Sequence, residues 1–307
     1  MKVTLVTTVL NASDRIGPFL ESVAWQTRAP DEVVIVDGGS TDGTLEVLRG
    51  STDVATLVEE PGANIARGRN LAIASATHDV IAVSDADCVL ERDWLERLLE
   101  PLEAGADVAM GFYRPLAESF LQRAVACVNL PDAHELEEAT FMPSGRSVAF
   151  TKEAIERAGG YPEWLDIGED MFVDHRFREL GLDMRLASDA IVNWPLRGSL
   201  GETWRQYFRY ARGDAVAGMF PERHALRFGV YSAALYAWST KGPLRKAATL
   251  AGAGAYARTP LRRARGRFDD PAEHAKAMLV VPGLMAFIDG AKMAGWLAGV
   301  RHRRERP

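Results

Sequence analysis

The chain has 307 residues, 47% hydrophobic and 25% charged, a composition typical of a globular protein with one large domain or two smaller ones. This composition excludes a disordered chain, a collagen-like repeat and a small fold held together by disulfides. The two cysteines, Cys88 and Cys127, favour a reducing compartment. The opening apolar run 3–6 is too short for the core of a signal peptide, so we expect no secretory leader.

The net charge of −6 conceals two oppositely charged halves. Residues 1–200 carry 17 Lys and Arg against 34 Asp and Glu, whereas residues 201–307 carry 19 against 8. Such a split indicates different partners for the two halves. We therefore expect a boundary near residue 200, between a domain at 1–200 and a helical, Arg-rich region at 201–307.

Strands and helices alternate along the first half. Apolar, β-branched runs predict strands at 3–9, 33–36, 80–83 and 108–113. Helices are predicted from Ser13, which we expect to be an N-cap, and at 42–48, 66–76, 94–102, 116–130, 152–158 and 170–180. Uninterrupted apolar strands that alternate with helices are typical of an α/β domain with a largely parallel sheet covered on both faces.

Three acids follow the second and third predicted strands, where ligands bind in parallel sheets. Asp85 and Asp87 are one residue apart and can both reach a divalent cation, and their oxygens suit Mg²⁺ or Mn²⁺. An acidic loop in which Asp87 caps the next turn explains the same pattern. Asp37 can accept hydrogen bonds from a nucleotide's base or ribose, or from its own backbone turn, and both interpretations can hold together.

Two further helix starts carry charged side chains. The segment 64–70 places Arg67 and Arg69 at a helix N-terminus, where phosphate is favoured, although a solvated helix face explains them equally well. Glu169 and Asp170 open another helix, where acids also stabilise the helix dipole. Several other kinds of site are disfavoured, because the chain has no Gly-x-Ser-x-Gly elbow, no dinucleotide-binding glycine pattern, no Walker motif and no zinc-ligand spacing.

Taken in order, these segments resemble the family 2 glycosyltransferases, inverting enzymes of the GT-A fold. The resemblance covers residues 1 to about 215. It is carried by the strand 3–9 with Asn11, by the segments 34–44, 64–70 and 84–87, and by 168–170 with Arg176 downstream. It implies an α/β, Rossmann-like fold with a mostly parallel sheet flanked by helices and a helical C-terminal extension.

The resemblance also implies roles for individual residues around a UDP-, GDP- or dTDP-linked sugar. The implied donor contacts are Thr7, Thr8, Asn11, Asp37, Arg67, Asn70, Asp85 and Ala86, and the implied metal ligands are Asp87 and Asp85. Asp170 is the implied general base, and the implied acceptor contacts are Glu169, Ser144, Gly145, Gln206 and Arg209. A carboxylate is needed to take the acceptor's proton, and cations stabilise the leaving diphosphate.

The chain departs from the family pattern at two places. Asn193-Trp194-Pro195 stands where many relatives carry a histidine that can complete the metal site, so the third protein ligand is open, and Arg197 is an alternative contact for the diphosphate. Residues 206–210 match the Q-x-x-R-W motif of processive members only in part, and no uncharged apolar stretch reaches about 20 residues. We therefore expect transfer of single sugars.

Two arginine clusters, at 258–267 and 301–306, flank an apolar stripe in the second half. The stripe consists of Val280, Leu284, Phe287, Ile288 and Ala291. This pattern is typical of an interfacial helix on an anionic leaflet, and also of a packed helical subdomain with a basic tail. Nucleic acid is not expected, because no known binding module accompanies the charge.

The prediction from sequence is a metal-dependent, hexosyltransferase-type enzyme of cell-envelope glycan or glycolipid synthesis. We expect it in the cytoplasm, peripheral at the inner face of the cell membrane. Three alternatives remain open: a soluble transferase acting on a small molecule, a nucleotidyltransferase, and a non-catalytic scaffold that keeps the fold.

Overall fold

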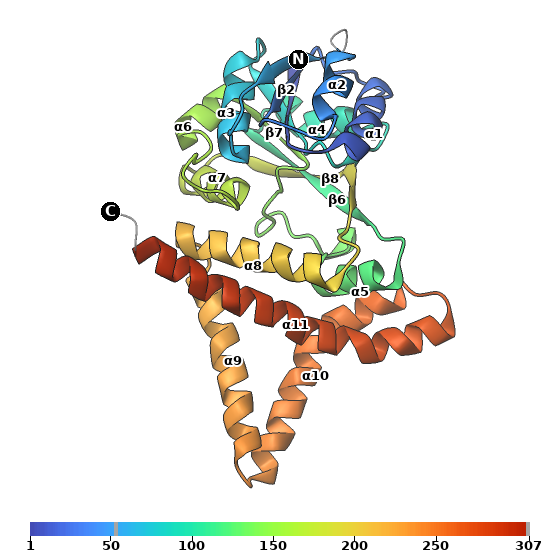
Figure 1. The fold of residues 1–307 in the computed structure, drawn as a ribbon, viewed down its shortest axis with the longest axis vertical. Helices are drawn as coiled ribbons and strands as arrows, with labels where there is room; N and C mark the ends of the chain where they lie inside the picture. Colours follow the sequence, from blue (N-terminus) through green and yellow to red (C-terminus); the bar gives the residue numbers. More distant parts are fainter. Residues whose placement is uncertain (52–54, 305–307) are drawn as a thin grey trace. The chain divides into compact units, whose positions relative to one another are not determined.

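The computed structural model describes residues 1–51 and 55–304, which fall into two compact units (Figure 1). The first unit comprises residues 1–116 and 133–195, and the second comprises 117–132 and the chain from 196 onward. The segment 117–132 belongs with the second unit because its side chains are bonded there. Gln122 donates to the carbonyl of Leu196 at 2.8 Å, and Arg123 forms an ion pair with Glu273 at 2.7 Å.

An eight-stranded sheet forms the centre of the first unit, in the order β3-β2-β1-β4-β7-β6-β8-β5. The strands are β1 (Val3–Val9), β2 (Glu32–Asp37), β3 (Thr56–Glu59), β4 (Val80–Val83), β5 (Val89–Leu90), β6 (Val108–Leu116), β7 (Val148–Thr151) and β8 (Met184–Pro195). The first four strands in this order are parallel, as are β6 and β8, whereas β7 is antiparallel to β4 and β6, and β5 is antiparallel to β8. The mostly parallel α/β sheet is confirmed, with one reversed strand in its middle.

Helices flank this sheet and bury their apolar faces on it. They are α1 (Ser13–Ala24), α2 (Thr44–Arg49), α3 (Ile65–Ser75), α4 (Trp94–Glu103), α6 (Lys152–Ala158) and α7 (Glu169–Glu179), and a 3-10 turn η1 covers Ala133–Glu135. The core strands are apolar on both faces, and Val6, Val34 and Ile81 have no exposed surface. The glycine at position 68 lets α3 approach β1, since a Cβ there would lie 2.7 Å from the Thr8 methyl group.

The sequence-based prediction was wrong or incomplete at five places. Ser13 is the first helical residue of α1, not its N-cap. The amides at this helix start are bonded to another loop, with Ala12 N–H donating to Thr44 Oγ1 and Ser13 N–H to Asp42 Oδ2. Four strands were not predicted: β3, β5, β7 and β8. β3 is a half-exposed edge, β5 has two residues, β7 has four, and β8 mixes polar with apolar positions.

The second unit is helical. It contains α5 (Phe120–Asn129), α8 (Leu200–Ala217), α9 (Pro221–Ser239), α10 (Pro243–Arg265) and α11 (Pro271–Arg304). The long helix α11 packs closely along α8, because a Cβ at Gly295 or Gly299 would collide with the backbone of Phe208 or Arg212. Leu284, Ile288 and Ala291 of the predicted apolar stripe are buried in this unit's core, which contradicts a membrane-facing role for them.

One described helix, Pro271–Arg303, is long and apolar enough to cross a membrane, with a mean hydropathy of 1.5 in its best window. By length and composition alone this is weak support for a span, since core helices of soluble proteins pass the same criterion. Its one buried acid, Asp289, is bonded within the unit to Arg227, Tyr231 and Tyr256. In its best window, 39% of the residues are buried, and these pack in the core of the second unit.

Candidate active site

Three buried oxygens without a hydrogen-bond partner lie at or near the carboxyl ends of β1, β2 and β4. They are Thr7 Oγ1, Asp37 Oδ2 and Ser84 Oγ. Buried polar atoms in folded proteins are nearly always bonded, because leaving one unsatisfied costs about 1–3 kcal/mol. These oxygens therefore indicate a place that a polar ligand or water completes, and two of them belong to residues predicted to contact the donor.

The loop after β2 is shaped around Asp37 and Asn11. Asp37 Oδ1 accepts from the backbone N–H of Gly39 and Ser40, each at 2.8 Å, as expected for a turn-forming aspartate. Asn11 has a positive φ of 52°, and its Oδ1 accepts from Thr41 N–H at 2.9 Å. The turn role of Asp37 thus uses one carboxylate oxygen and leaves the other for a ligand.

The two aspartates after β4 face arginines from separate elements. Asp85 forms ion pairs with Arg69 at 2.8 Å and with Arg146 at 3.7 Å. Asp87 forms an ion pair with Arg15 of α1 at 3.3 Å. Both carboxylates are partly exposed, 30% for Asp85 and 22% for Asp87. They form a carboxylate pair at the surface of the unit, with arginine side chains beside it.

Arg69 links this pair to the start of α7. Its guanidinium is 3% exposed, donates to Glu169 Oε1 at 2.7 Å and to Asp85 Oδ1 at 2.8 Å, and lies over the Tyr161 ring at 5.2 Å. The neighbouring carboxylates raise the pKa of Arg69 against the opposing effect of burial, so it is always charged. Gly145 is required here, because a Cβ at that position would collide with the Arg69 guanidinium.

The predicted base lies one residue after Glu169. Asp170 Oδ2 accepts from Gly145 N–H at 3.1 Å, and its Oδ1 accepts from Met171 N–H at 2.9 Å. A carboxylate has about four lone-pair sites, so these bonds orient Asp170 and leave it free to accept a further proton. Gly168, with a φ of 85°, supplies the left-handed turn that starts α7 here.

Two other acids of α7 are buried near Asp170. Burial raises the pKa of Glu169 to about 7, with a contribution from Asp170, although Arg69 opposes the shift. Burial also raises the pKa of Asp174 well above its usual value, and its Oδ2 has no partner. The start of α7 therefore combines a partly exposed carboxylate with two whose charge is disfavoured by burial.

Several of the predicted site residues are bonded to groups other than these carboxylates. Arg67 is half exposed and forms an ion pair with Glu60 at 2.5 Å. The Asn70 amide is bonded on both sides to the Tyr161 backbone, at 2.9 Å each. Gln206 and Arg209 lie on α8 of the second unit, where Gln206 donates to Tyr210 at 2.9 Å. Their predicted ligand contacts remain predictions.

Arg15 and Arg146 were not singled out from the sequence, and Arg69 was named only as a helix-start cation that favours phosphate, not as a buried bridge between carboxylates. A signal for Arg69 was present: it lies three residues from both Ala66 and Ala72, on the buried stripe of α3, whereas Arg67 does not. Arg146 lies over the Trp194 ring at 4.0 Å and donates to Ser144 at 2.7 Å. Trp194 belongs to the segment 193–195, at which a departure from the family pattern was expected from the sequence, and its ring packs against this arginine.

The chemistry of the donor set fits a divalent cation that is held partly by its substrate. In the chain as described, no group of three or more His, Cys, Asp or Glu side chains is arranged to hold a metal. Asp85 and Asp87 supply hard oxygens, and Mg²⁺ is commonly bound by one or two carboxylates together with phosphate and water. The residues therefore fit a cation completed by a diphosphate.

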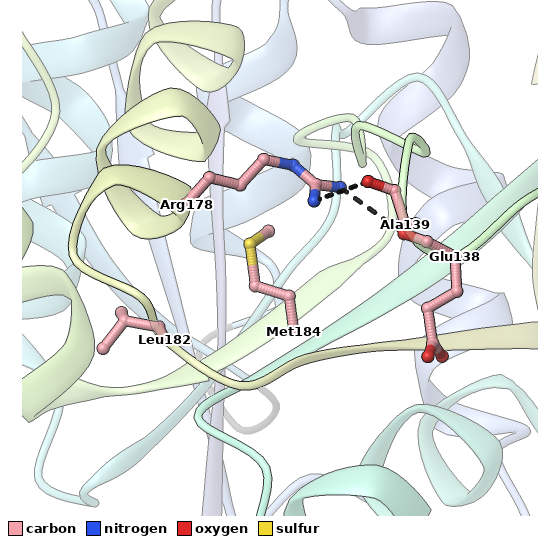
Figure 2. Close-up of a pocket in the computed structure, with 5 residues that line it drawn as sticks. All are labelled: Glu138, Ala139, Arg178, Leu182 and Met184. Atoms are coloured by element: carbon pink, nitrogen blue, oxygen red, sulfur yellow. Dashed lines mark hydrogen bonds between the residues drawn. The ribbon is translucent and has the colours of Figure 1, made fainter.

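A cavity of about 270 Å³ lies at the far end of α7 (Figure 2). It is lined by Glu138, Ala139, Arg178, Leu182 and Met184. Arg178 donates to the carbonyl of Ala139 at 2.9 Å and also to that of Phe141. It thereby fixes the loop that leads to Ser144 and Gly145. The cavity lies beside this loop, and Arg178 belongs to both the cavity lining and the loop contacts.

The sequence profile described as Glycosyl transferase family 2 matches residues 4–142. Among curated relatives, glycosyltransferase AglE of Haloferax volcanii is 28% identical over 250 residues, which are 76% of this chain and 79% of AglE. The O-antigen chain rhamnosyltransferase RfbN of Salmonella typhimurium is 26% identical over 68% of this chain and 71% of its own length.

Among solved structures, the mannosyltransferase PcManGT from Pyrobaculum calidifontis, in complex with GDP-Man and Mn²⁺, is similar with a TM-score of 0.56. It is 22% identical, and the similarity covers 99% of this chain and 87% of that one. This likeness concerns the fold, and it agrees with the GT-A architecture expected from the sequence. The profile match places residues 4–142 in glycosyl transferase family 2, and the curated relatives and the fold agree with it.

Proposed function

We propose that this protein transfers a sugar from a nucleotide-diphosphate sugar to an acceptor hydroxyl, with inversion at the anomeric carbon. The observation that carries the proposal is the bridge made by Arg69 between Asp85 and Glu169. It joins the carboxylate pair suited to a diphosphate-bound cation to the helix start that holds the predicted base. Leaving group and nucleophile must meet on opposite sides of one sugar carbon, and this bridge supports such an arrangement.

The donor half of the site is proposed at the strand ends. Thr7, Thr8, Asn11 and Asp37 would bind the nucleoside, and the unpartnered Oδ2 of Asp37 supports this role. Arg67, Asn70 and Ala86 complete the proposed set. Asp85 and Asp87 would hold Mg²⁺ or Mn²⁺, which when bound supplies charge neutralisation to the leaving diphosphate. Arg15 and Arg146 add positive charge beside the same oxygens.

The acceptor half of the site is proposed around Asp170. Its carboxylate accepts the proton of the acceptor hydroxyl as that oxygen attacks, a role worth roughly 10² to 10⁴ in rate. Gly145 N–H holds Asp170 in position, and Glu169 and Ser144 are proposed to contact the acceptor together with Gln206 and Arg209. The buried guanidinium of Arg69 holds the Glu169 carboxylate in place by an ion pair.

We further propose that the acceptor belongs to a cell-envelope glycan or glycolipid. RfbN is named for O-antigen chain synthesis, and this supports the proposal by relationship. The proposed enzyme transfers hexoses in the cytoplasm, peripheral at the inner face of the membrane, with residues 1–200 catalytic and 201–307 docking on lipid. The excess of basic residues in 201–307 supports the docking role.

Nucleotide release tests the proposal directly. The purified chain is incubated with Mn²⁺ or Mg²⁺ and a panel of UDP-, GDP- and dTDP-sugars, and released nucleoside diphosphate is measured. We expect one donor to be turned over with a divalent cation and not with excess chelator. Asp170→Asn should lower turnover by at least about 100-fold while donor binding, measured by calorimetry, is kept.

A matched variant separates loss of the base from loss of the fold. Asp166→Asn removes an exposed carboxylate four residues earlier and should leave turnover unchanged. Full activity in Asp170→Asn would exclude it as the base, and metal-dependent turnover in Asp87→Ala would exclude the metal assignment. Absence of turnover and of donor binding across the panel would favour a scaffold, whereas glycosylation of small soluble acceptors alone would favour the soluble alternative.

A further inference from the structure

The helical hairpin formed by α9 and α10 carries a concentration of exposed apolar side chains. Of the eighteen large hydrophobic residues that are exposed in the described chain, eight lie between residues 226 and 256. They are Leu226, Val230, Leu235, Tyr236, Trp238, Leu244, Leu250 and Tyr256. Leu244 is 84% exposed and Leu235 75%. Such a concentration of exposed apolar side chains in one hairpin indicates a partner that covers it.

The same stretch of chain has charge of a single sign. Residues 223–268 contain ten Lys and Arg and no Asp or Glu. Such a segment is complementary to an anionic surface, and it opposes pairing with a second copy of itself, because like charges would be brought together. Apolar side chains combined with unopposed positive charge are the two contributions that bind a protein to anionic lipid.

The hairpin is anchored at its base and projects from there (Figure 1). Arg227 and Tyr231 of α9 and Tyr256 of α10 are all bonded to Asp289 of α11. Between Tyr231 and Tyr256, all of which the structure describes, Ala237 is the only buried residue. The two arms meet at a distal tip, and the residues that join them, 240–242, are not buried in a core.

The tip combines aromatic rings with cations. The Arg245 guanidinium lies 5.4 Å from the Tyr236 ring, and the Lys246 ammonium lies 5.4 Å from the Trp238 ring. Trp and Tyr concentrate at the headgroup level of membranes, where Lys and Arg reach lipid phosphates. The free stretches 232–239 and 243–255 are roughly 12 and 20 Å long at 1.5 Å per residue, short of the ~30 Å hydrocarbon core. The tip can therefore enter one leaflet and cannot span the bilayer.

We propose that the α9–α10 tip is a lipid-binding element for anionic membranes. Leu235, Trp238 and Leu244 enter the boundary between headgroups and acyl chains, and Lys241, Arg245 and Lys246 bind lipid phosphates. The inference rests on the membrane location in the proposed function and refines it. It moves the contact from the apolar stripe of α11, which is buried, to a hairpin whose apolar residues are free.

Co-sedimentation with vesicles tests this assignment on the full chain. Vesicles of phosphatidylcholine alone are compared with vesicles containing about 30% phosphatidylglycerol, and only the anionic ones should bind. Replacing Lys241, Arg245 and Lys246 together with Gln should weaken binding on the order of 100-fold. The matched control, Arg97, Arg157 and Arg185 replaced together with Gln, makes the same charge change in the first unit and should bind as the parent does.

Tryptophan quenching by brominated acyl chains reports insertion separately from charge. Trp238→Phe should lose most of the quenching seen in the parent, and Leu244→Ser should weaken binding without a change of charge. Equal quenching in Trp238→Phe, or binding that the tip variants leave unchanged, would overturn the proposal. A concentration-dependent dimer that the tip variants abolish, with no vesicle binding, would assign the hairpin to a second copy instead and also overturn it.

Failure of this inference can be distinguished from failure of the proposed function. Nucleotide release is measured without vesicles, where the tip variants should equal the parent. If vesicle binding fails while a donor is turned over, the hairpin proposal falls and the transferase proposal stands. If no donor is turned over but the tip binds anionic vesicles, the lipid-binding element stands by itself.

Discussion

A buried arginine is paired with a buried carboxylate in each of the two units, and in the second unit both oxygens of that carboxylate are bonded. Asp289 accepts from Arg227 at 2.8 Å, from Tyr231 at 3.0 Å and from Tyr256 at 2.9 Å, so both of its oxygens are bonded. The ring of His224 receives an N–H from the same arginine, at 3.0 Å. Every partner is a residue of the same unit, and the network fastens α9 and α10 to α11.

In the first unit the corresponding network is incomplete. Arg69 bridges Glu169 and Asp85, but Asp85 is partly open to solvent and Asp174 has an oxygen without a partner. Burying ionised groups is costly unless each is fully bonded. The two networks therefore differ in role. Where every oxygen of the buried carboxylate is bonded, which we call a saturated network, the charged groups hold helices together. Where carboxylate oxygens lack partners or face solvent near the strand ends, they are available to a ligand.

The largest expected effect comes from removing the two arginines in turn. Arg69→Leu and Arg227→Leu should each destabilise the protein by about 3–5 kcal/mol, because each leaves a carboxylate buried and unpaired. Arg69→Leu should also abolish donor turnover, whereas Arg227→Leu should keep donor binding in the folded fraction. Urea unfolding and calorimetry with the donor measure both properties. Loss of donor binding in a folded Arg227→Leu would show that the two networks do not differ as described.

The pH dependence of stability tests the incomplete network by itself. The folded pKa of Glu169 is raised to about 7 from 4.5, so the folded chain holds a proton there that the unfolded chain has released. The associated stability is complete below about pH 4.5 and is lost as the pH rises through 7, up to about 3 kcal/mol in total. Asp174 acts in the same direction.

Urea unfolding at several pH values across this window measures the effect. Glu169→Gln cannot titrate and should flatten the slope. A parent slope equal to that of Glu169→Gln would contradict the assignment to this carboxyl.

Two glycines of α11 sharpen the comparison on the structural side. Gly299→Val should destabilise the second unit by about 1–3 kcal/mol, because the new side chain would collide with α8. Gly283 has open space around its Cα in the same helix, so Gly283→Ala should instead stabilise by about 0.5–1 kcal/mol through helix propensity. Thermal unfolding followed by circular dichroism measures both. Equal effects would mean that α8 and α11 do not approach closely.

The sequence predicted those features that depend on local pattern. β1 and β4 are apolar throughout, and the helix Lys152–Ala158 is closed by glycines, so their bounds were predicted to the residue. The antiparallel direction of β7 was not predictable. The direction of a strand in a sheet is set by its tertiary pairing, and a short apolar run does not indicate that direction. The edge strand β3 gave no alternation because it is half exposed.

The candidate site divides in the same way. Asp37, Asp85 and Asp170 were predictable because each follows a recognisable strand end or helix start. Arg146 was not, because what places it is the ring of Trp194, 48 residues later in the chain. The hairpin tip was missed because its apolar residues have no helical stripe to follow. These apolar residues are distinguished only by their exposure, which cannot be read from the sequence.

The smallest expected effect concerns Arg178, which supports the first unit's site from a distance. It binds the carbonyl of Ala139 (Figure 2) and that of Phe141. It thereby fixes the loop in which the Gly145 N–H donates to Asp170. Arg178→Gln should cost about 1–2 kcal/mol of stability, because the loop carbonyls lose a charged donor. If the loop also positions the base, turnover at saturating donor should fall a few-fold while the donor KM is kept.

Arg157→Gln is the control for Arg178, since it removes an exposed arginine with a loose 3.9 Å ion pair in α6 and should change neither property. Rescue by Arg178→Lys should be partial, because an ammonium cannot reach several carbonyls at once as the planar guanidinium does. A loss of stability without a loss of turnover would restrict Arg178 to a structural role. Arg178 would then only stabilise the packing of the first unit, as the saturated network around Asp289 does in the second unit.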